Sequence, residues 1–357
     1  MKQIDLIYRT MIAELGQRLL DASFATDFPI EGRFVPVTVK QRVYWYFDQP
    51  SPEGEKRRYV GPADDEEITR RVEAFKEIKG DAKARRKLVS TLTRDAGLPA
   101  PERFSGDVVE ALADAGIFRL RACLVGTVAF QTYAGVLGVR LPATSMMTGD
   151  ADFAQDYAIS AEVEDSIPPI LQILNDLDPT FRPVPHRSGS ARTTAFQNAA
   201  RYRVEFLTGN RGSDDYLDQP AEMPALGGAS ADPLWFLDFL IYEPIRAVLL
   251  HKSGISVIVP APERYAVHKL IVASLRVVDT TDVAKREKDL RQASILFQAL
   301  QETNRGGDLG DAIMEAWGRG EGWRLAIRSG LAFMPKKEKA AVAAFLSSLG
   351  IDPESEA

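Results

Sequence analysis

Two aspartates separated by one residue, Asp150 and Asp152, have the side chains best suited to metal-dependent chemistry. In an extended strand alternate residues face the same side, so both carboxylates would share one face while Ala151 and Phe153 face the core. Two carboxylates held this close repel each other unless a cation lies between them. Magnesium prefers oxygen ligands, commonly one or two carboxylates together with substrate phosphates. The pair therefore indicates a metal position, although an Asp-x-Asp alone is also common as an exposed polar stretch of strand.

A second motif, Gly126-Thr127, follows the apolar residues Leu124 and Val125, where a strand would end and a helix begin. Glycine lets the backbone approach a ligand closely. Thr127 could cap the helix and leave free N–H groups at its positive end, which suits a phosphate group. An ordinary strand-to-helix turn with a capping threonine fits the same residues, so this motif gains weight only beside the two aspartates.

Hydrophobic periodicity and turn residues give the elements that must position these motifs. Helices are predicted over residues 4–21, across the charged segment 64–96, over 127–138, over 163–177 despite its prolines, and from Pro262 onward. Strands are predicted at 33–39, 42–47, 57–62, 118–125, 150–159, 181–186, 193–198, 202–208, 247–250 and 256–260. Gly97, Pro99 and Pro101 mark a boundary before the alternating part.

These elements predict an α+β protein whose mixed sheet is flanked by helices. We expect an N-terminal helical region over 1–117 carrying a small antiparallel sheet at about 33–62, a core over 118–260, and a C-terminal helical domain over 261–357. The small sheet contains the aromatic run Tyr44-Trp45-Tyr46 beside several basic residues. These rings could stack on nucleic-acid bases, but a small hydrophobic core is the favoured interpretation.

Composition restricts the class of protein. The 357 residues are 45% hydrophobic and 26% charged, with a net charge of −6, which is typical of a globular protein and does not indicate general nucleic-acid binding. A single cysteine, Cys123, favours a reducing cytoplasm, and three scattered histidines provide no Cys/His zinc cluster. The most apolar stretch, 234–250, is interrupted by Asp238, Glu243 and Arg246, so no membrane span is expected.

A strand, a Gly-Thr turn, a helix and a strand with alternate aspartates together resemble the nucleotidyltransferase superfamily of the DNA polymerase β type. In that pattern a hydrophobic residue, Gly and Ser precede a helix, and Asp-hydrophobic-Asp or Glu follows. Gly126-Thr127 and Asp150-Ala151-Asp152 occupy these positions here. Thr127 replaces the usual serine but keeps the hydroxyl. The 22 residues between Thr127 and Asp150 exceed the usual spacing and include an apparent loop insertion after the helix.

The superfamily usually adds a third carboxylate on a later strand, and Glu205 is the best match. Tyr202, Val204 and Phe206 would face inward and leave Glu205 on the opposite face with Arg203. An ordinary amphipathic strand explains the same pattern equally well. Rival carboxylates follow in a loop: Asp214, Asp215 and Asp218.

The segment after Pro262 is similar to bacterial nucleotidyltransferases of the abortive-infection toxin type. The features that carry this likeness are a short strand, a proline, a helix with Lys269, and a later Lys288-Asp289-Leu290. The resemblance makes Lys269 a candidate triphosphate ligand, whereas His268 is expected to be a packed or surface side chain. The YWY strand and the Tyr-Val-Gly-Pro turn ahead of the core also look like those of a little-characterised bacterial family with the nucleotidyltransferase fold.

The resemblance implies transfer of a nucleoside monophosphate from an NTP to an acceptor, with Mg²⁺ or Mn²⁺ as cofactor. Asp150, Asp152 and Glu205 would be the catalytic metal ligands, and Gly126, Thr127 and Lys269 would bind the nucleotide. The acceptor would be tRNA or another RNA, or a protein, and a toxin-like enzyme would have an antitoxin as partner. Basic residues that could receive an anionic acceptor, or simply be solvated, are Arg182, His186, Arg187, Arg192, Arg201 and Arg203. The alternative is a non-catalytic module of this fold that binds nucleic acid or a protein.

Overall fold

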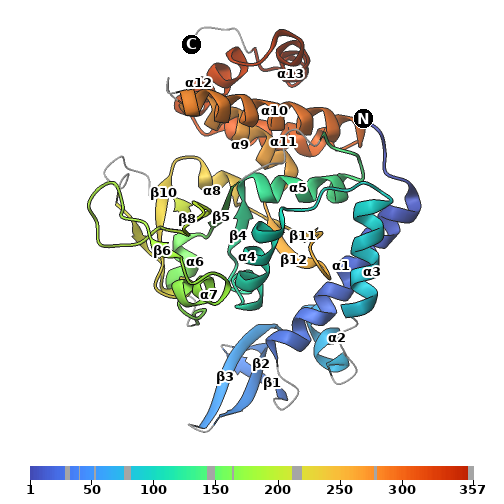
Figure 1. Ribbon diagram of the computed structural model, residues 1–357. Helices are drawn as coiled ribbons and strands as arrows, with labels where there is room; N and C mark the ends of the chain where they lie inside the picture. The colour runs from blue at the N-terminus through green and yellow to red at the C-terminus, as the bar shows by residue number, and fades with distance from the viewer. Residues whose placement is uncertain are drawn as a thin grey trace.

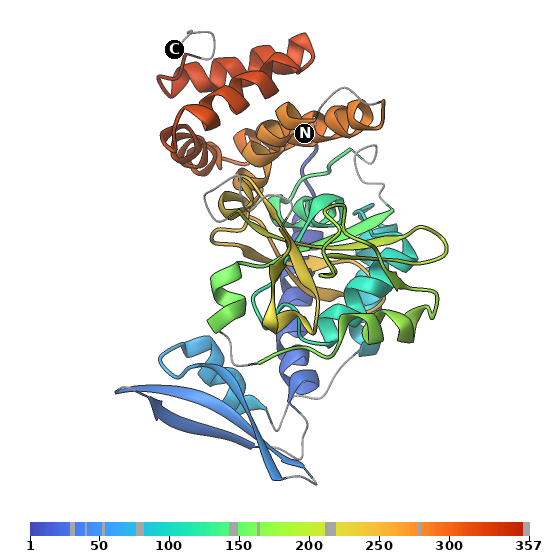
Figure 2. The same cartoon turned by 90° about the vertical axis from the view of Figure 1, so that its left-hand side faces the viewer.

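The computed structural model describes residues 1–28, 33–39, 41–51, 54–75, 82–142, 149–162, 165–210, 219–276 and 280–352. Three layers of structure follow one another along the molecule (Figure 1). A small sheet lies at one end, a mixed sheet with its helices lies in the middle, and a group of C-terminal helices lies at the other end. The same order is visible after a quarter turn (Figure 2).

The N-terminal elements are α1 (Leu6–Asp27), β1 (Arg33–Val39), β2 (Arg42–Ser51), β3 (Gly54–Pro62), α2 (Glu66–Ala74) and α3 (Ala82–Arg94). The three strands form the predicted antiparallel sheet in the order β1-β2-β3. One face of this sheet has an aromatic core in which Phe47 packs against Phe28, Phe34 and Phe75 with ring centroids 4.8–5.9 Å apart. These phenylalanines give the small sheet its own hydrophobic core, whereas Tyr59 is exposed.

The central part begins with α4 (Arg103–Asp114) and continues with β4 (Cys123–Val125), α5 (Gly126–Leu137), β5 (Asp150–Ala154), α6 (Tyr157–Glu162), α7 (Ile170–Leu177), β6 (Arg182–Pro183), β7 (Ala195–Gln197), β8 (Arg203–Gly209), β9 (Ala221–Glu222), the 3-10 helix η3 (Pro224–Leu226), β10 (Ser230–Leu234), α8 (Leu237–Leu240), β11 (Ile245–Leu249) and β12 (Ile255–Val259). The main sheet has the order β4-β5-β8-β10-β9, and β7 and β6 extend it from β8. β4 is antiparallel to β5, while β5, β8 and β10 are parallel to one another. The sheet is therefore mixed, as the sequence predicts.

Several boundaries differ from the sequence prediction. Residues 118–121 form a turn instead of the start of a strand, because Arg121 adopts a left-handed backbone with φ of 63° that no strand can contain. The strand at 150 ends at Ala154, and helix α6 follows. Pro168 and Pro169 restrict the helix predicted over 163–177 to α7. β9, β10 and α8 were not predicted, since Pro233 within β10 argues against a strand.

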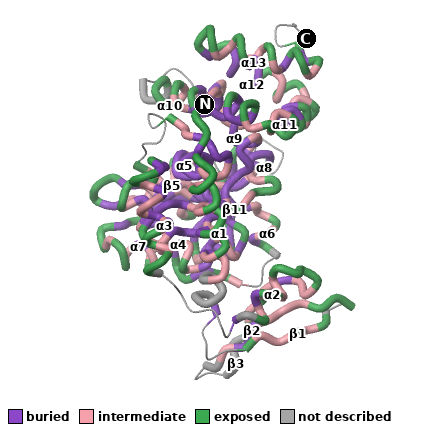
Figure 3. Tube along the Cα trace, turned by 90° about the vertical axis from the view of Figure 1, so that its right-hand side faces the viewer, coloured by how far each residue is buried: buried purple, intermediate pink, exposed green. Residues whose placement is uncertain are grey.

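The chain from Pro262 onward contains α9 (Pro262–Leu275), α10 (Thr280–Glu302), α11 (Gly306–Gly318), α12 (Glu321–Ala332) and α13 (Lys336–Ser348). Buried residues extend from the central sheet through α5 into α9 and α10 (Figure 3). One hydrophobic core joins Phe153 and Phe206 of the sheet to Tyr265 and Leu296 of these helices. The C-terminal helices thereby share one core with β5 and β8, the strands that carry the predicted carboxylates. Among the described helices, none has the length and apolar character that crossing a membrane requires.

Candidate active site

Three adjacent strands bring the predicted carboxylates to one level of the sheet. Val125 at the end of β4 pairs with Asp152 of β5, and Asp152 pairs with Glu205 of β8. Burial alternates along β5, with Ala151 and Phe153 buried and both aspartates partly accessible. It alternates likewise along β8, where Val204 and Phe206 are buried. The two strands therefore present Asp150, Asp152 and Glu205 on one face.

The electrostatics of this face favour a bound cation. Burial, together with the charges of Asp150 and Glu205, raises the pKa of Asp152 well above its usual range. The pKa of Glu205 is also raised, first by burial and also by Asp150, while its neighbour Arg203 opposes the shift. Arg203 Nε lies 2.5 Å from Glu205 Oε1. Oxygen ligands that are crowded, partly desolvated and alike in charge match the preference of a divalent metal ion.

Gly126 closes one side of this group of carboxylates. Its φ is 67°, a conformation that favours glycine. A β-carbon at this position would overlap Oδ2 of Asp152 and lie 3.3 Å from its carboxyl carbon. Only a residue without a side chain lets the turn approach the carboxylate this closely. The turn and the Asp152 carboxylate are therefore in direct contact.

Helix α5 starts at this turn, but Thr127 does not cap it. Val125 is the N-cap residue and makes no side-chain cap, whereas Thr127 lies inside the first turn with 5% of its surface exposed. The predicted capping role is therefore wrong, because the helix begins one residue earlier than the motif suggested. The first-turn N–H groups still point from the positive end of α5 at the level of Asp152.

Helix α9 is hydrogen-bonded directly to the turn. The Tyr265 hydroxyl lies 2.9 Å from the Gly126 carbonyl oxygen and 3.1 Å from Oε1 of Gln292 on α10. Tyr265 is fully buried. This contact fixes the backbone of Gly126 relative to the C-terminal helices and therefore supports the position of the turn beside Asp152.

Lys269 of α9 lies near the carboxylates, but its ammonium group is already paired. Its Nζ is 2.6 Å from Oδ1 of Asp289, a side chain with 2% exposure that also accepts from Arg276 at 3.0 Å. Its charge lowers the pKa of Asp152, against the larger effects that raise it. Lys288 interacts electrostatically with Asp150 and Asp152 as well, and its own pKa is lowered first by burial and then by Lys269. The charges of two lysines thus act at the aspartates, whereas the family resemblance indicates a ligand role only for Lys269.

Other residues singled out in the sequence fall outside this group. His268 is packed, and burial with the charge of Lys269 lowers its pKa to about 3, so the imidazole is neutral. Asp214, Asp215 and Asp218 lie outside the described residues. Several of the basic residues proposed to receive an acceptor have internal partners instead: Arg182 with carbonyl oxygens, Arg192 with Glu222, Arg203 with Glu205 and His186 with Asp232.

Sequence reasoning missed Asp232. It lies on β10, whose neighbour β8 carries Glu205, and its charge contributes to the raised pKa of Glu205. Its carboxylate accepts hydrogen bonds from Thr194 Oγ1 at 2.9 Å and lies 2.8 Å from His186 Nε2. Asp232 lies between the buried residues Ala231 and Pro233, and this alternation could have indicated a strand. The proline, however, argues against a strand at this position.

A further acidic group lies on α4 and the β11–β12 turn. Ligand atoms of Asp107, Glu110 and His251 lie within 4.8 Å of one another. Lys252 Nζ, however, is 2.6 Å from Asp107 and 2.5 Å from Glu110. An ammonium group therefore already supplies the positive charge at this position. We interpret the group as a packing contact between α4 and the hairpin.

Comparison with known proteins assigns the central part of the chain. The sequence profile of a family described as nucleotidyltransferase matches residues 103–318, which is more than half of the chain. The chain belongs to this nucleotidyltransferase family. The matched region runs from α4 through α11 and includes the Gly126 turn, the three carboxylates and both lysines. Comparison of the nucleotidyltransferase with curated proteins and with solved structures gave no match.

Proposed function

We propose that this nucleotidyltransferase transfers a nucleoside monophosphate from an NTP to an acceptor in a reaction that requires Mg²⁺ or Mn²⁺. The observation that carries the proposal is the pairing of Val125, Asp152 and Glu205 across three strands, with Gly126 directly against the Asp152 carboxylate. A phosphate-binding turn and metal-binding carboxylates at one level of a sheet are the minimum that this chemistry needs.

Asp150, Asp152 and Glu205 would hold the metal. When bound, the metal would supply the positive charge that orients the triphosphate and stabilises charge developing at the α-phosphorus. The acceptor oxygen forms a bond to that phosphorus, and the bond to the bridging oxygen breaks, so pyrophosphate leaves with the electron pair. Glu205 is positioned to take the proton of the acceptor group, and the first-turn amides at Gly126 and Thr127 would bind phosphate oxygens.

The two lysines would then have different tasks. Lys269 is paired with buried Asp289, which makes it a fixed charge beside Asp152. Lys288 is half-buried beside the same aspartates. We propose that Lys288 shares the triphosphate-binding role that the family resemblance gave to Lys269. For the acceptor we retain tRNA or another RNA, or a protein, and a toxin-like enzyme with an antitoxin partner remains part of the proposal.

Label transfer tests the function directly. Purified protein is incubated with each of the four NTPs, labelled at the α-phosphate, and with total RNA or a protein fraction, with Mg²⁺ or with EDTA. The wild type should label one acceptor class only when metal is present. Asp152→Asn keeps the size of the side chain but loses the charge, so labelling should fall at least about a hundredfold, since each lost metal contact costs several kcal/mol.

Asp176→Asn is the matched control, because Asp176 is an exposed aspartate of α7 in the same core. It should label as the wild type does. Equal labelling by Asp152→Asn and the wild type would contradict the proposal. If neither labels any fraction, metal-dependent NTP binding by the wild type that is absent from Asp152→Asn is the deciding measurement, and its absence would favour the non-catalytic alternative.

A further inference from the structure

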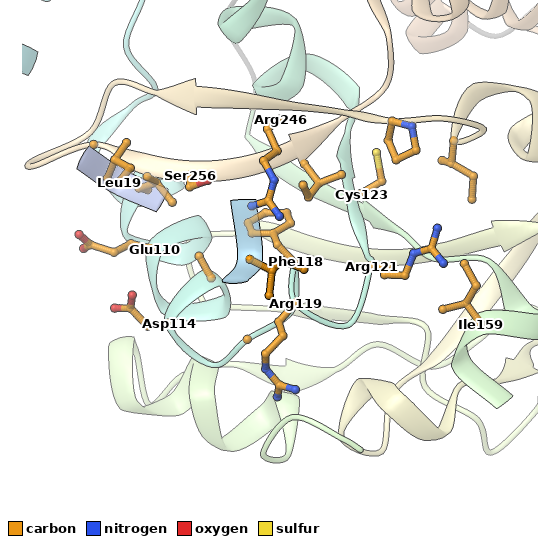
Figure 4. Close-up of a pocket in the computed structure, with 18 of the residues that line it drawn as sticks. Leu19, Glu110, Asp114, Phe118, Arg119, Arg121, Cys123, Ile159, Arg246 and Ser256 are labelled. Atoms are coloured by element: carbon orange, nitrogen blue, oxygen red, sulfur yellow. The ribbon is translucent and has the colours of Figure 1, made fainter. Parts of the chain in front are cut away.

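A cavity lies at the opposite end of β4 from Gly126 (Figure 4). Its volume is about 1040 Å³, and its walls come from α2, α3, the turn before β4 and the β11–β12 hairpin. Cys123, at the start of β4, lines this cavity, whereas Val125, at the end of β4, pairs with Asp152. The cavity is therefore separate from the group of carboxylates.

Five arginines from four different elements line this cavity: Arg71, Arg85, Arg119, Arg121 and Arg246. Arg119 is paired with Asp165 at 2.5 Å, and Arg71 is paired with Glu67 and lies 3.9 Å from Asp21. The side chains of Arg121 and Arg246 make no hydrogen bond or ion pair with any residue that the structure describes, and both are accessible. Arg121 also has the left-handed backbone that ends the turn before β4, a conformation that costs free energy.

No hydrogen bond or ion pair joins Arg121 or Arg246 to the described carboxylates that line the cavity, which are Glu110, Asp114, Asp156, Asp238 and Glu243. Glu110 accepts from Lys252, Asp238 pairs with Arg319, and Asp156 accepts the backbone N–H of Ala158. In Figure 4 the carboxylates of Glu110 and Asp114 are directed away from Arg246. Arg246 interacts electrostatically with Asp65, but its guanidinium donates to no described carboxylate and keeps its N–H donors for a ligand.

The nearby positive charges of Arg246 and Arg71 also favour a bound anion. Arg246 lies close enough to Arg71 to lower the pKa of Arg71, second to the effect of burial. Burial also lowers the pKa of Arg246 itself. Arg71 already has Glu67 and Asp21 as counter-charges. Arg246 has no hydrogen-bonded carboxylate among the described residues, so an anion bound beside Arg246 would offset its repulsion with Arg71. Guanidinium groups bind phosphate through paired N–H donors, which gives them a geometric match to this anion.

One part of the wall, beside Arg246 and Arg121, is apolar. Arg246 extends from β11 toward the ring of Phe118, and Cys123 and Ile159 lie beside Arg121 (Figure 4). We propose that this cavity binds a small phosphorylated ligand of nucleotide size, with its phosphate at Arg246 and Arg71 and its ring against Phe118. The volume agrees with cavities that enclose such molecules. An RNA strand would need an extended basic groove, which a cavity bounded on several sides in a chain of net charge −6 does not provide.

Calorimetric titration of the full chain with ADP, inorganic pyrophosphate and adenosine tests this proposal. EDTA is present throughout, so that the metal-dependent carboxylate site does not contribute. The wild type and Asp152→Asn should bind ADP equally, pyrophosphate should also bind, and adenosine should not. Arg246→Gln should weaken ADP binding at least about tenfold, since it removes a charge-assisted phosphate contact. Arg246→Lys keeps the charge but not the paired donors, so its affinity for ADP should lie between those of the wild type and Arg246→Gln.

Arg94→Gln provides the matched control, because Arg94 is an exposed arginine at the end of α3 that does not line the cavity. Its affinity for ADP should equal that of the wild type. The proposal is overturned if ADP and pyrophosphate do not bind, or if Arg246→Gln binds them as tightly as the wild type does. Binding of a single-stranded RNA but not of ADP, with the same dependence on Arg246, would assign the surface to an acceptor instead. Since Asp152→Asn keeps this site, the result does not depend on the proposed catalytic function.

Discussion

The α-carbon of Gly126 lies so close to Asp152 that a methyl group added to it would overlap Oδ2 of the aspartate carboxylate. The same glycine has a φ of 67° and accepts a hydrogen bond from Tyr265 at its carbonyl oxygen. Gly126 is therefore subject to three structural constraints: the limited space beside the Asp152 carboxylate, the left-handed backbone of the turn, and the hydrogen bond from Tyr265 of α9. Each of them can be tested separately.

Gly126→Ala should abolish nucleotidyl transfer and destabilise the protein by about 1–2 kcal/mol, which is the cost of the left-handed conformation for a residue with a β-carbon. The overlap with Asp152 adds a displacement of the carboxylate. Gly149→Ala is the matched control, because Gly149 precedes Asp150 but has no atom within 4 Å of an added β-carbon. Urea unfolding and label transfer measure the two effects. Wild-type transfer by Gly126→Ala would show that the close approach is dispensable.

Tyr265→Phe should lower the rate of transfer while leaving the affinity for NTP nearly unchanged. The variant loses only the hydroxyl that lies 2.9 Å from the Gly126 carbonyl oxygen and 3.1 Å from Gln292. One lost hydrogen bond costs about 1 kcal/mol in stability, so the protein should remain folded. A lower kcat with an unchanged KM would show that the Tyr265 hydroxyl positions the turn and does more than pack against it. If stability falls and both kinetic constants are unchanged, the contact serves folding alone.

Asp289→Asn should be the most destabilising of the polar changes around the site. Asp289 is 2% exposed and is the carboxylate shared by Lys269 and Arg276, so its loss leaves buried cations without their counter-charge. Breaking such a pair costs about 3 kcal/mol. Asp311→Asn on exposed α11 is the control. A change below 1 kcal/mol in urea unfolding would mean that solvent already compensates these charges.

The same ion pair changes the expectation for Lys269→Ala. The family resemblance makes Lys269 a candidate triphosphate ligand, so the variant should bind nucleotide more weakly, and the contact with Asp289 predicts a loss of stability as well. Lys288→Ala should weaken NTP binding with a smaller effect on stability, because Lys288 is only half-buried. NTP affinity and the midpoint of thermal unfolding, measured for both variants, separate the two roles. Unchanged NTP affinity in both variants would exclude lysine from triphosphate binding here.

His268 should make the protein less stable as the pH falls below neutrality. Burial, then the charge of Lys269, lowers the pKa of His268 to about 3, and the unfolded chain has a histidine pKa of about 6.5. Between these values the unfolded state binds a proton that the folded state does not, so the stabilising contribution decreases from pH 6.5 toward pH 3. In urea unfolding at pH 7, 6 and 5, His268→Gln should lose less stability than the wild type does. Parallel pH profiles would show that the imidazole is protonated when folded.

The sequence predicted the features of this site that depend on neighbouring residues, and it did not predict those that depend on residues far apart along the chain. Alternation along 150–154 and 203–209 is a local property, so the sequence predicts that Asp150 and Asp152 share one face of their strand and that Glu205 faces away from Val204 and Phe206 on its own strand. The order of the strands could not be predicted, because parallel neighbours such as β5 and β8 are joined through a long connection. Asp232 was missed for this reason and because Pro233 hides its strand.

Helix contacts were the least predictable part. Lys269 and Asp289 lie 20 positions apart on two helices, and no periodicity relates them. The turn at 118–121 was predicted as a strand because Phe118, Leu120 and Ala122 alternate with arginines, which is the pattern of a half-buried strand. The left-handed backbone of Arg121 overrides that pattern.

The single cysteine of the chain, Cys123, lies in β4, so the reactivity of its thiol can report local opening of this strand. Cys123 is buried with a raised pKa, so a thiol reagent can modify it only when the strand separates transiently from its neighbours. Two residues further on, Val125 pairs with Asp152, and on the other side the thiol borders the arginine-lined cavity. The rate at which the Cys123 thiol is modified therefore measures how often β4 opens between the carboxylate group and the arginine-lined cavity. A ligand that binds the closed form at either site should slow this modification.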